Sequence, residues 1–79
     1  MNAIGEIRLF PYENVPEGFL VCKGQLLEIQ TYPKLYMLIG NKYGKSDAEH
    51  FYLPDLNHKA DNAFSYCMAV AGKIPVLSI

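Results

Sequence analysis

Two cysteines and two histidines are the residues of this chain whose side chains could support covalent catalysis. Cys22 or Cys67, paired with His50 or His58, would form the thiol–imidazole couple that activates a cysteine nucleophile. Each cysteine lies inside an apolar run, however, and a thiol in apolar surroundings tends to stay protonated and unreactive. The sequence therefore favours structural thiols over a catalytic pair, and we predict no catalytic residue.

Metal binding is the second chemistry to consider, because acidic residues lie near the two histidines. His50, Asp55, His58 and Asp61 follow one another within a short stretch. Their spacing lacks the close ligand pair, C-x-x-C or H-x-x-x-H, that anchors many protein metal sites. We predict neither a metal site nor a cofactor. For Asp55, which follows Pro54, we predict a structural role, its carboxylate accepting hydrogen bonds from backbone N–H groups just downstream.

Two states are open for the cysteines. The pattern favours two free thiols buried in strands, since Cys22 and Cys67 both follow apolar or aromatic residues. The alternative is one disulfide that closes a long loop and stabilises the protein by about 2–4 kcal/mol in an oxidising compartment. Both remain open at this level, because the sequence does not give the distance between the two Cα atoms.

The chain contains six tyrosines, whose flat amphipathic rings suit sugars and protein partners when they are exposed. The alternative, which we favour, is that most of them line the core or a subunit contact, because aromatic side chains supply large buried areas per residue. The tyrosines to which this choice applies are Tyr32, Tyr36, Tyr43, Tyr52 and Tyr66.

Length and composition favour one small domain over residues 1–79. The chain is 51% hydrophobic, but a domain of this length buries only about 60–65% of its unfolded surface, so partner subunits would add needed stability. The net charge is −1 and the seven basic residues are scattered, which argues against nucleic-acid binding and a polybasic membrane anchor.

Hydropathy argues against a membrane protein. No apolar run approaches the roughly 20 residues of a membrane span. The first residues, Met1 to Gly5, lack the basic and apolar regions of a signal peptide. We therefore expect cytoplasmic synthesis without signal-dependent export, and no membrane insertion.

The elements that would position these side chains are short. Residues 4–10 alternate, which predicts a half-buried strand with Ile7 and Leu9 facing a core, ended by Pro11. Residues 19–22 and 27–29 predict two further strands. A tight turn at Lys23 and Gly24 would join them into a small hairpin.

A short helix is predicted near residues 32–40. Thr31 is a candidate N-cap, and Pro33 is tolerated in a first turn because its missing N–H has no helical partner there. Leu35, Leu38 and Ile39 recur at helical spacing and form one apolar face, and Gly40 or Asn41 would close the helix.

The second half of the chain adds extended segments at residues 51–53 and 66–71. Together these elements predict an α+β fold: a small single domain of short, mostly antiparallel strands with one short helix. The predicted core consists of apolar side chains from both kinds of element, namely Ile7, Leu9, Leu35, Leu38, Ile39, Phe51 and Leu53.

Several of these stretches, taken in order, resemble the phage tail collar domain family, which includes the collar of short tail fibres and the bacterial microcystin-dependent proteins. The resemblance covers about residues 4–56, and a segment from Tyr66 to Pro75 is similar, more weakly, to the closing strand of the bacterial members. The matching motifs are Gly5-Glu6-Ile7-Arg8-Leu9-Phe10; residues 16–27 around Gly18, Cys22, Gly24 and Gln25; Leu35 with Leu38-Ile39-Gly40; Tyr43-Gly44; and Phe51-x-Leu53-Pro54-Asp55-Leu56.

The chain also departs from the family pattern. Phe19 and Lys23 stand where the family usually has Trp and Asp, and Asn57-His58-Lys59 replaces the usual basic turn. The long glycine-rich insert that in fibre proteins leads towards the receptor-binding tip and its metal-binding histidines is nearly absent. Neither metal binding nor receptor binding is therefore carried over to this chain.

The resemblance implies a compact assembly unit that works through protein contacts in a phage, a prophage or a tail-derived particle. Fibre collars pack around a symmetry axis, so we expect a homo-oligomer, with a trimer as the specific case, and contacts with other tail or particle proteins. A binding module for a cell-surface saccharide, using exposed tyrosines and the 41–50 loop, is the alternative. An enzyme is the third and least favoured hypothesis.

Overall fold

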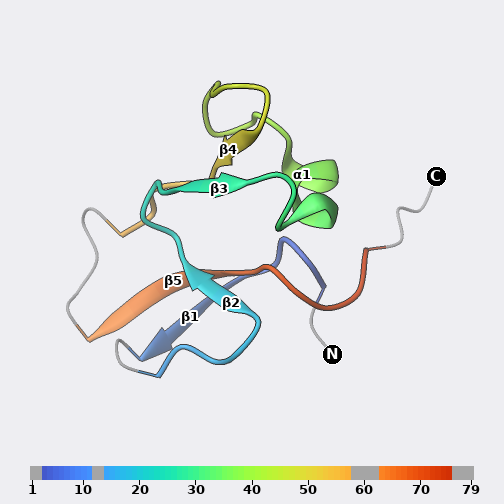
Figure 1. The fold of residues 1–79 in the computed structure, drawn as a ribbon. Coiled ribbons are helices and arrows are strands. Elements are labelled where there is room, and N and C mark those ends of the chain that lie inside the picture. The colour runs from blue at the N-terminus through green and yellow to red at the C-terminus, as the bar shows by residue number, and fades with distance from the viewer. Residues whose placement is uncertain (1–2, 12–13, 58–62, 76–79) are drawn as a thin grey trace.

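Two layers build the protein, as the computed structural model in Figure 1 shows. It describes residues 3–11, 14–57 and 63–75. A three-stranded sheet forms one layer, and a two-stranded sheet with a helix forms the other. In chain order the elements are β1 (Ile7–Pro11), β2 (Phe19–Val21), β3 (Leu26–Glu28), α1 (Pro33–Ile39), β4 (His50–Tyr52) and β5 (Phe64–Ala69).

The larger sheet is built around the last strand of the chain. Its order is β1-β5-β2, and both outer strands run antiparallel to β5. Along β1, Ile7 lies opposite Met68 and Leu9 lies opposite Tyr66. The sequence prediction of a strand at residues 66–71 is confirmed, although β5 begins two residues earlier and ends at Ala69.

The predicted hairpin between residues 19–22 and 27–29 is wrong. The strands β2 and β3 exist, but β2 pairs with β5 and β3 pairs with β4. The chain leaves the first sheet after Val21, where the Gln25 amide nitrogen donates to the Val21 carbonyl at 2.8 Å. Gly24 does take the expected positive φ, of 74°, but its N–H donates to Pro54 O instead of closing a hairpin. The intervening residues therefore connect two sheets.

The predicted helix is confirmed as α1, with Pro33 in its first turn. Gly40 closes it with a φ of 50°, and its N–H donates to Tyr36 O at 2.7 Å. The Thr31 cap is wrong: Tyr32 occupies the N-cap position without a side-chain cap bond, and the Thr31 hydroxyl donates to the Glu28 carboxylate. The helix has seven residues, so packing of buried Leu35 holds it in place.

The main core lies between the two layers. Its fully buried members come from both of them and include Cys22, Leu35, Phe51, Leu53 and Met68, each with at most 1% of its surface exposed. Of the predicted core residues, Leu35, Phe51 and Leu53 are therefore confirmed, whereas Leu38 and Ile39 are partly buried and pack against this cluster.

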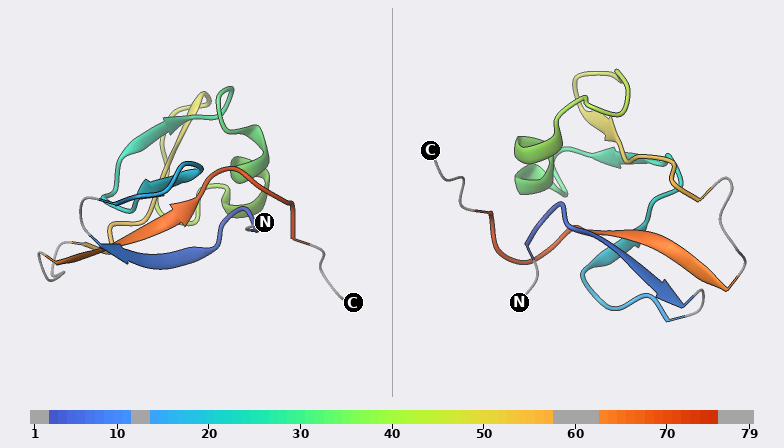
Figure 2. Two further views of the ribbon diagram at one scale, coloured as in Figure 1. Left: turned by 90° about the horizontal axis from the view of Figure 1, so that it is seen from below. Right: turned by 180° about the vertical axis from the view of Figure 1, so that it is seen from behind.

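Ile7 and Leu9 were predicted to be core residues, and this prediction is wrong. They are 41% and 51% exposed. The alternation itself is correct, because Ile7 lies opposite core residue Met68 and therefore on the same face of the sheet. The second layer does not extend over the C-terminal end of β1 and the N-terminal end of β5, which lie side by side and project beyond it in Figure 2.

The opposite face of the sheet carries a second, smaller cluster of Phe19, Cys67 and Ala69. Val15, from the loop before β2, packs against it, and the Phe10 and Phe19 rings meet edge-on at 4.9 Å. Short antiparallel strands and one short helix thus form the α+β fold that the sequence predicts. Among the described residues, no helix has the length and hydropathy needed to cross a bilayer.

Candidate functional site

The two cysteines are buried free thiols, as the sequence favoured. Neither side chain has measurable exposure. Burial raises the pKa of the Cys22 thiol to about 11, with a smaller contribution from neighbouring Cys67, and burial also raises the pKa of Cys67. A nucleophilic cysteine needs the opposite shift, because only the thiolate attacks. These thiols are therefore packing groups of the core.

The strand register places the cysteines on opposite faces of the sheet. Val21 lies opposite Cys67, so these two side chains share a face, and Cys22, the next residue, points to the other. Cys22 accordingly belongs to the main core, and Cys67 belongs to the smaller cluster. A disulfide requires Cβ atoms that face one another, so the disulfide alternative does not fit this geometry.

The histidine His50 pairs with an acid of its own loop. Its Nδ1 lies 2.7 Å from Asp47 Oδ1, and the Glu49 N–H donates to the same carboxylate oxygen. The hydrogen bond with Asp47 raises the pKa of His50 above its ordinary value. The hydrogen bond with His50, supported by that of the Glu49 N–H, lowers the pKa of Asp47. The pair orders the loop before β4, and both side chains remain open to solvent.

Replacing Asp47 by Asn is expected to lower the pKa of His50 towards its ordinary value. An amide does not favour the charged imidazolium as a carboxylate does, so NMR titration of the His50 ring should follow a curve shifted to lower pH. In the wild type, the pair stabilises the fold between the ordinary pKa values of 3.8 and 6.5. That stabilisation declines as pH rises through the raised His50 pKa or falls through the lowered Asp47 pKa. An unchanged His50 titration in Asp47→Asn would contradict the assigned pairing.

The four candidate metal ligands do not come together in the described part of the chain. His58 and Asp61 lie outside the described residues. Asp55 is exposed, and its backbone forms an isolated antiparallel β-bridge with that of Lys23. His50 lies on β4. No group of three or more ligating side chains is found among residues 3–11, 14–57 and 63–75. The predicted absence of a metal site stays a prediction, and so does the Asx-turn role of Asp55.

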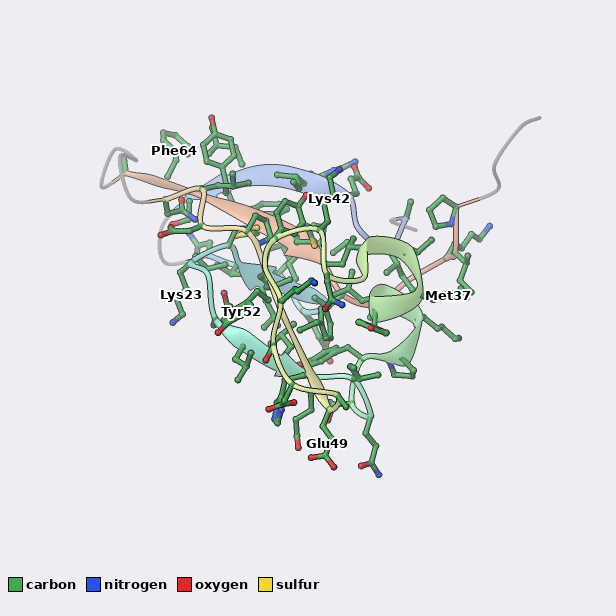
Figure 3. The ribbon with its side chains drawn as sticks, turned by 90° about the horizontal axis from the view of Figure 1, so that it is seen from above. Lys23, Met37, Lys42, Glu49, Tyr52 and Phe64 are labelled. Carbon is green, nitrogen blue, oxygen red and sulfur yellow. The ribbon has the colours of Figure 1, made fainter. Side chains whose placement is uncertain are left out.

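A solvent-open hollow of about 300 Å³ lies beside β3 and β4. Two carboxylates, Glu28 and Glu49, line it together with Ile29, Gln30 and Ala48. Both carboxylate residues are exposed, as Figure 3 shows for Glu49 at the edge of the molecule. Two carboxyl groups can act as an acid and a base when different environments, at least one of them shielded from water, separate their pKa values. This hollow is open to solvent and offers no such environment.

The tyrosines are mostly packed against the core, as the favoured alternative proposed. Tyr32, Tyr36 and Tyr43 are half-buried against the main cluster, and the Tyr36 ring lies 5.3 Å from that of Phe51. Tyr52 is also half-buried. Tyr66, on β5, differs because 42% of its surface is exposed. The tyrosine signal for a binding surface therefore reduces, in the described residues, to Tyr66 and its neighbours.

Tyr66 and three other exposed apolar side chains form one group, which we call the β1/β5 surface. Ile7 and Leu9 come from β1, and Phe64 and Tyr66 come from β5; each is 41–51% exposed. Leu9 lies directly opposite Tyr66, and Phe64 comes two residues before Tyr66 in β5, so all four share one face of the sheet. Figure 3 shows Phe64 at one end of the molecule, far from the exposed Met37 of α1.

A side-chain clamp holds β5 in place where β2 ends. The Asn57 amide nitrogen donates to Cys22 O at 2.8 Å and to Tyr66 O at 3.0 Å, and the Tyr66 N–H donates to Asn57 Oδ1 at 2.9 Å. The Cys22 N–H also donates to Tyr66 O at 2.9 Å, so Asn57 supplies the acceptor for the Tyr66 N–H that the Cys22 carbonyl would supply if β2 continued. This arrangement fixes the backbone beneath Tyr66, the central β5 residue of the β1/β5 surface.

Sequence reasoning missed this surface. It assigned Ile7 and Leu9 to the core and did not consider Phe64. The signal was present, because Phe64, Tyr66 and Met68 alternate in the same way as Ile7 and Leu9. Two alternating strands that are longer than the layer covering them leave part of an apolar face exposed.

Comparison with known protein families gives a match. The model described as Phage Tail Collar Domain matches residues 5–60, which includes every element from β1 to β4. No curated protein and no solved structure was found to be significantly similar to the chain. The match agrees with the motifs of the sequence, and it ends before β5, the central strand of the larger sheet.

Proposed function

We propose that the protein is a non-catalytic assembly unit of a tail or tail-like particle. The proposal starts from the family: the chain belongs to the phage tail collar domain family, whose model matches more than two thirds of it. Family membership suggests a structural role in a phage tail fibre. The finer proposal is that residues 1–79 act as one collar-like domain that works through protein–protein contacts.

The observation that carries this proposal is the β1/β5 surface. Four adjacent side chains, Ile7, Leu9, Phe64 and Tyr66, expose 41–51% of their area on one face of a sheet. Scattered exposed apolar residues are ordinary on soluble proteins, whereas a contiguous group of them indicates a place where another molecule binds. A catalytic role lacks comparable support, because burial raises the pKa values of both thiols.

Self-association follows from the same surface. A domain of this size has a small stability margin, and covering a shared apolar face stabilises the folded state by mass action. We therefore propose a homo-oligomer, with the trimer of fibre collars as one specific form, and further contacts with other particle proteins.

Density-gradient sedimentation tests the particle role. An epitope-tagged chain, expressed in its own bacterial host, is expected to sediment with tail or tail-like particles, because a structural component remains bound after assembly. A cytosolic enzyme carrying the same tag serves as the control and should stay at the top of the gradient. Recovery of the tagged chain only at the top, in a preparation that contains intact particles, would contradict the proposal.

A saccharide-binding module is the second candidate, and exposed Tyr66 is the observation that favours it. An aromatic ring held on a rigid strand suits stacking against a sugar. A glycan array with the purified protein separates the two roles. Binding that is lost in Tyr66→Ala but kept in Tyr52→Ala would support the saccharide role, and an array without hits would exclude it.

A further inference from the structure

Within residues 3–11, 14–57 and 63–75, no strand pairs with the outer edge of β1, and the pattern of the ladder shows which backbone groups lie along that edge. In antiparallel pairs, successive residues point their N–H and C=O groups alternately towards and away from the neighbouring strand. The Ala69 N–H donates to Glu6 O at 2.8 Å, so Glu6, and with it Arg8 and Phe10, points towards β5. The backbone groups of Ile7 and Leu9 therefore point outward.

The other edge of the same sheet is already occupied. By the same alternation Phe19 and Val21 point outward from β2. The Phe19 N–H donates to Pro16 O at 3.2 Å, and Val21 O accepts the Gln25 side-chain N–H at 2.8 Å. A head-to-tail contact of β1 with β2 of the next copy would have to break these bonds. Within this sheet, the remaining complementary edge for β1 is a second β1.

We infer that the outer edge of β1 pairs antiparallel with β1 of a second copy of the chain, joining two sheets across a two-fold axis. The inference rests on the homo-oligomer proposed above and replaces its trimeric form by a two-fold pair. A two-fold contact is self-complementary, so each copy contributes the same backbone groups and the same apolar side chains. Ile7 of one copy would lie opposite Leu9 of the other, and their N–H and C=O groups would exchange hydrogen bonds in both directions.

The ends of β1 fix this register. Pro11 has no N–H to donate, so a shift towards it loses a hydrogen bond. Gly5 already donates its N–H to Ala69 O at 2.8 Å, so a shift in the other direction meets an occupied donor. Ile7 and Leu9 are the two residues between these limits whose groups point outward. The register centred on Arg8 uses both of them.

Charge is compatible with a second copy. Arg8 would lie opposite Arg8 of the other copy, which is unfavourable for a bare pair of like charges. Each Arg8, however, is neutralised by Glu6 of its own chain, at 2.6 Å, on the face opposite the β1/β5 surface. The two apolar surfaces would then continue one another on the other face without burying an unpaired charge.

The exposed area alone is too small for a permanent dimer. The four half-exposed side chains of the β1/β5 surface cover roughly a few hundred Å², whereas a standard stable interface buries about 800 Å² per partner. Backbone hydrogen bonds therefore have to contribute, and the expected contact is weak and concentration-dependent. Hydrogen-bonded pairing also explains why the contact is localised at the outer edge of β1.

Residue-resolved hydrogen exchange over a dilution series, combined with light scattering, tests the pairing. The Ile7 and Leu9 amides are expected to become protected as the wild type passes from monomer to dimer, whereas the Arg8 and Phe10 amides, which face β5, stay protected throughout. Leu9→Lys should abolish both the dimer and the protection. Leu26→Lys is the matched control, because Leu26 on β3 is 45% exposed and Leu9 is 51% exposed; it should dimerise like the wild type.

The outcomes separate this inference from the proposed function. A wild type that is monomeric at high micromolar concentration would overturn the self-association and the pairing together. Association without concentration-dependent protection of Ile7 and Leu9, or a trimer with a three-fold axis, would overturn only the pairing. Amide protection of Ile7 and Leu9 that appears only when a different particle protein is added would assign the outer edge of β1 to that protein and overturn the self-pairing.

A second variant separates the backbone from the side chain. Methylation of the Leu9 backbone nitrogen keeps the leucine side chain but removes the N–H donor, so this variant should also be monomeric.

Discussion

A chain truncated after residue 60 is expected to be unfolded, although it contains the whole region matched by the collar domain family. The truncation removes β5, which pairs with both β1 and β2. It also removes core residues Cys67, Met68 and Ala69. The two-stranded β3-β4 sheet that remains is marginal by itself in water. Far-UV circular dichroism and the amide region of an NMR spectrum should therefore show a disordered polypeptide.

The matched control for this truncation ends at residue 75 and keeps every element that the structure describes. It should retain dispersed amide resonances and a cooperative thermal transition. If the chain of residues 1–60 also unfolded cooperatively, β5 would not be the strand that completes the fold, and the sheet order β1-β5-β2 would be wrong.

Replacement of Phe51 by Ala is expected to cause the largest loss of stability among single substitutions. The ring is fully buried at the centre of the main core, where it contacts Tyr36 at a centroid distance of 5.3 Å. Removing such a side chain costs about 3–5 kcal/mol, because the transfer free energy is lost and a cavity remains. A small domain has a total stability near the low end of the ordinary range of about 5–15 kcal/mol, so this variant should be at or below the folding threshold.

Phe64→Ala provides the control with the same chemical change. Its ring is 45% exposed on the β1/β5 surface, so the loss should be about 1 kcal/mol or less when unfolding is measured at a concentration that keeps the protein monomeric. Urea denaturation of the two variants measures the difference in their free energies of unfolding. Equal losses would contradict the assignment of Phe51 to the core and Phe64 to the surface.

Local patterns were sufficient to predict the short helix and the strand at the end of the chain. Leu35, Leu38 and Ile39 recur at helical spacing, and Pro33 and Gly40 mark the limits of α1, so its position can be predicted from neighbouring residues, although packing of Leu35 stabilises it. The same holds for the buried thiols, since the apolar runs around Cys22 and Cys67 predicted the raised pKa values that burial produces.

Strand pairing could not be predicted in the same way, because it depends on residues that are distant in the chain. The Lys23 and Gly24 pair is typical of a hairpin turn, yet β2 pairs with β5 across 45 intervening positions, as Val21 opposite Cys67 shows. The partner of an isolated three-residue strand is set by which layers assemble, and local turn chemistry does not decide it.

Exposure of Ile7 and Leu9 was missed for a related reason. Alternation tells which side chains share a face, and it does so correctly for β1, but it does not tell how far the covering layer extends. The error coincides with the candidate site: the residues that local patterning assigns to a core, and that the fold leaves open, are those proposed to bind another copy.

Site-specific photo-crosslinking within assembled particles tests most directly whether the protein works through contacts at the β1/β5 surface. Benzoylphenylalanine would be introduced in place of Phe64 in one variant and in place of Met37, which is 63% exposed on α1, in the other. Figure 3 shows these two positions at separate ends of the molecule. We predict crosslinks to a second copy or to another particle protein from position 64, and few or none from position 37. Particles that incorporate both variants but yield crosslinks only from position 37 would contradict the account.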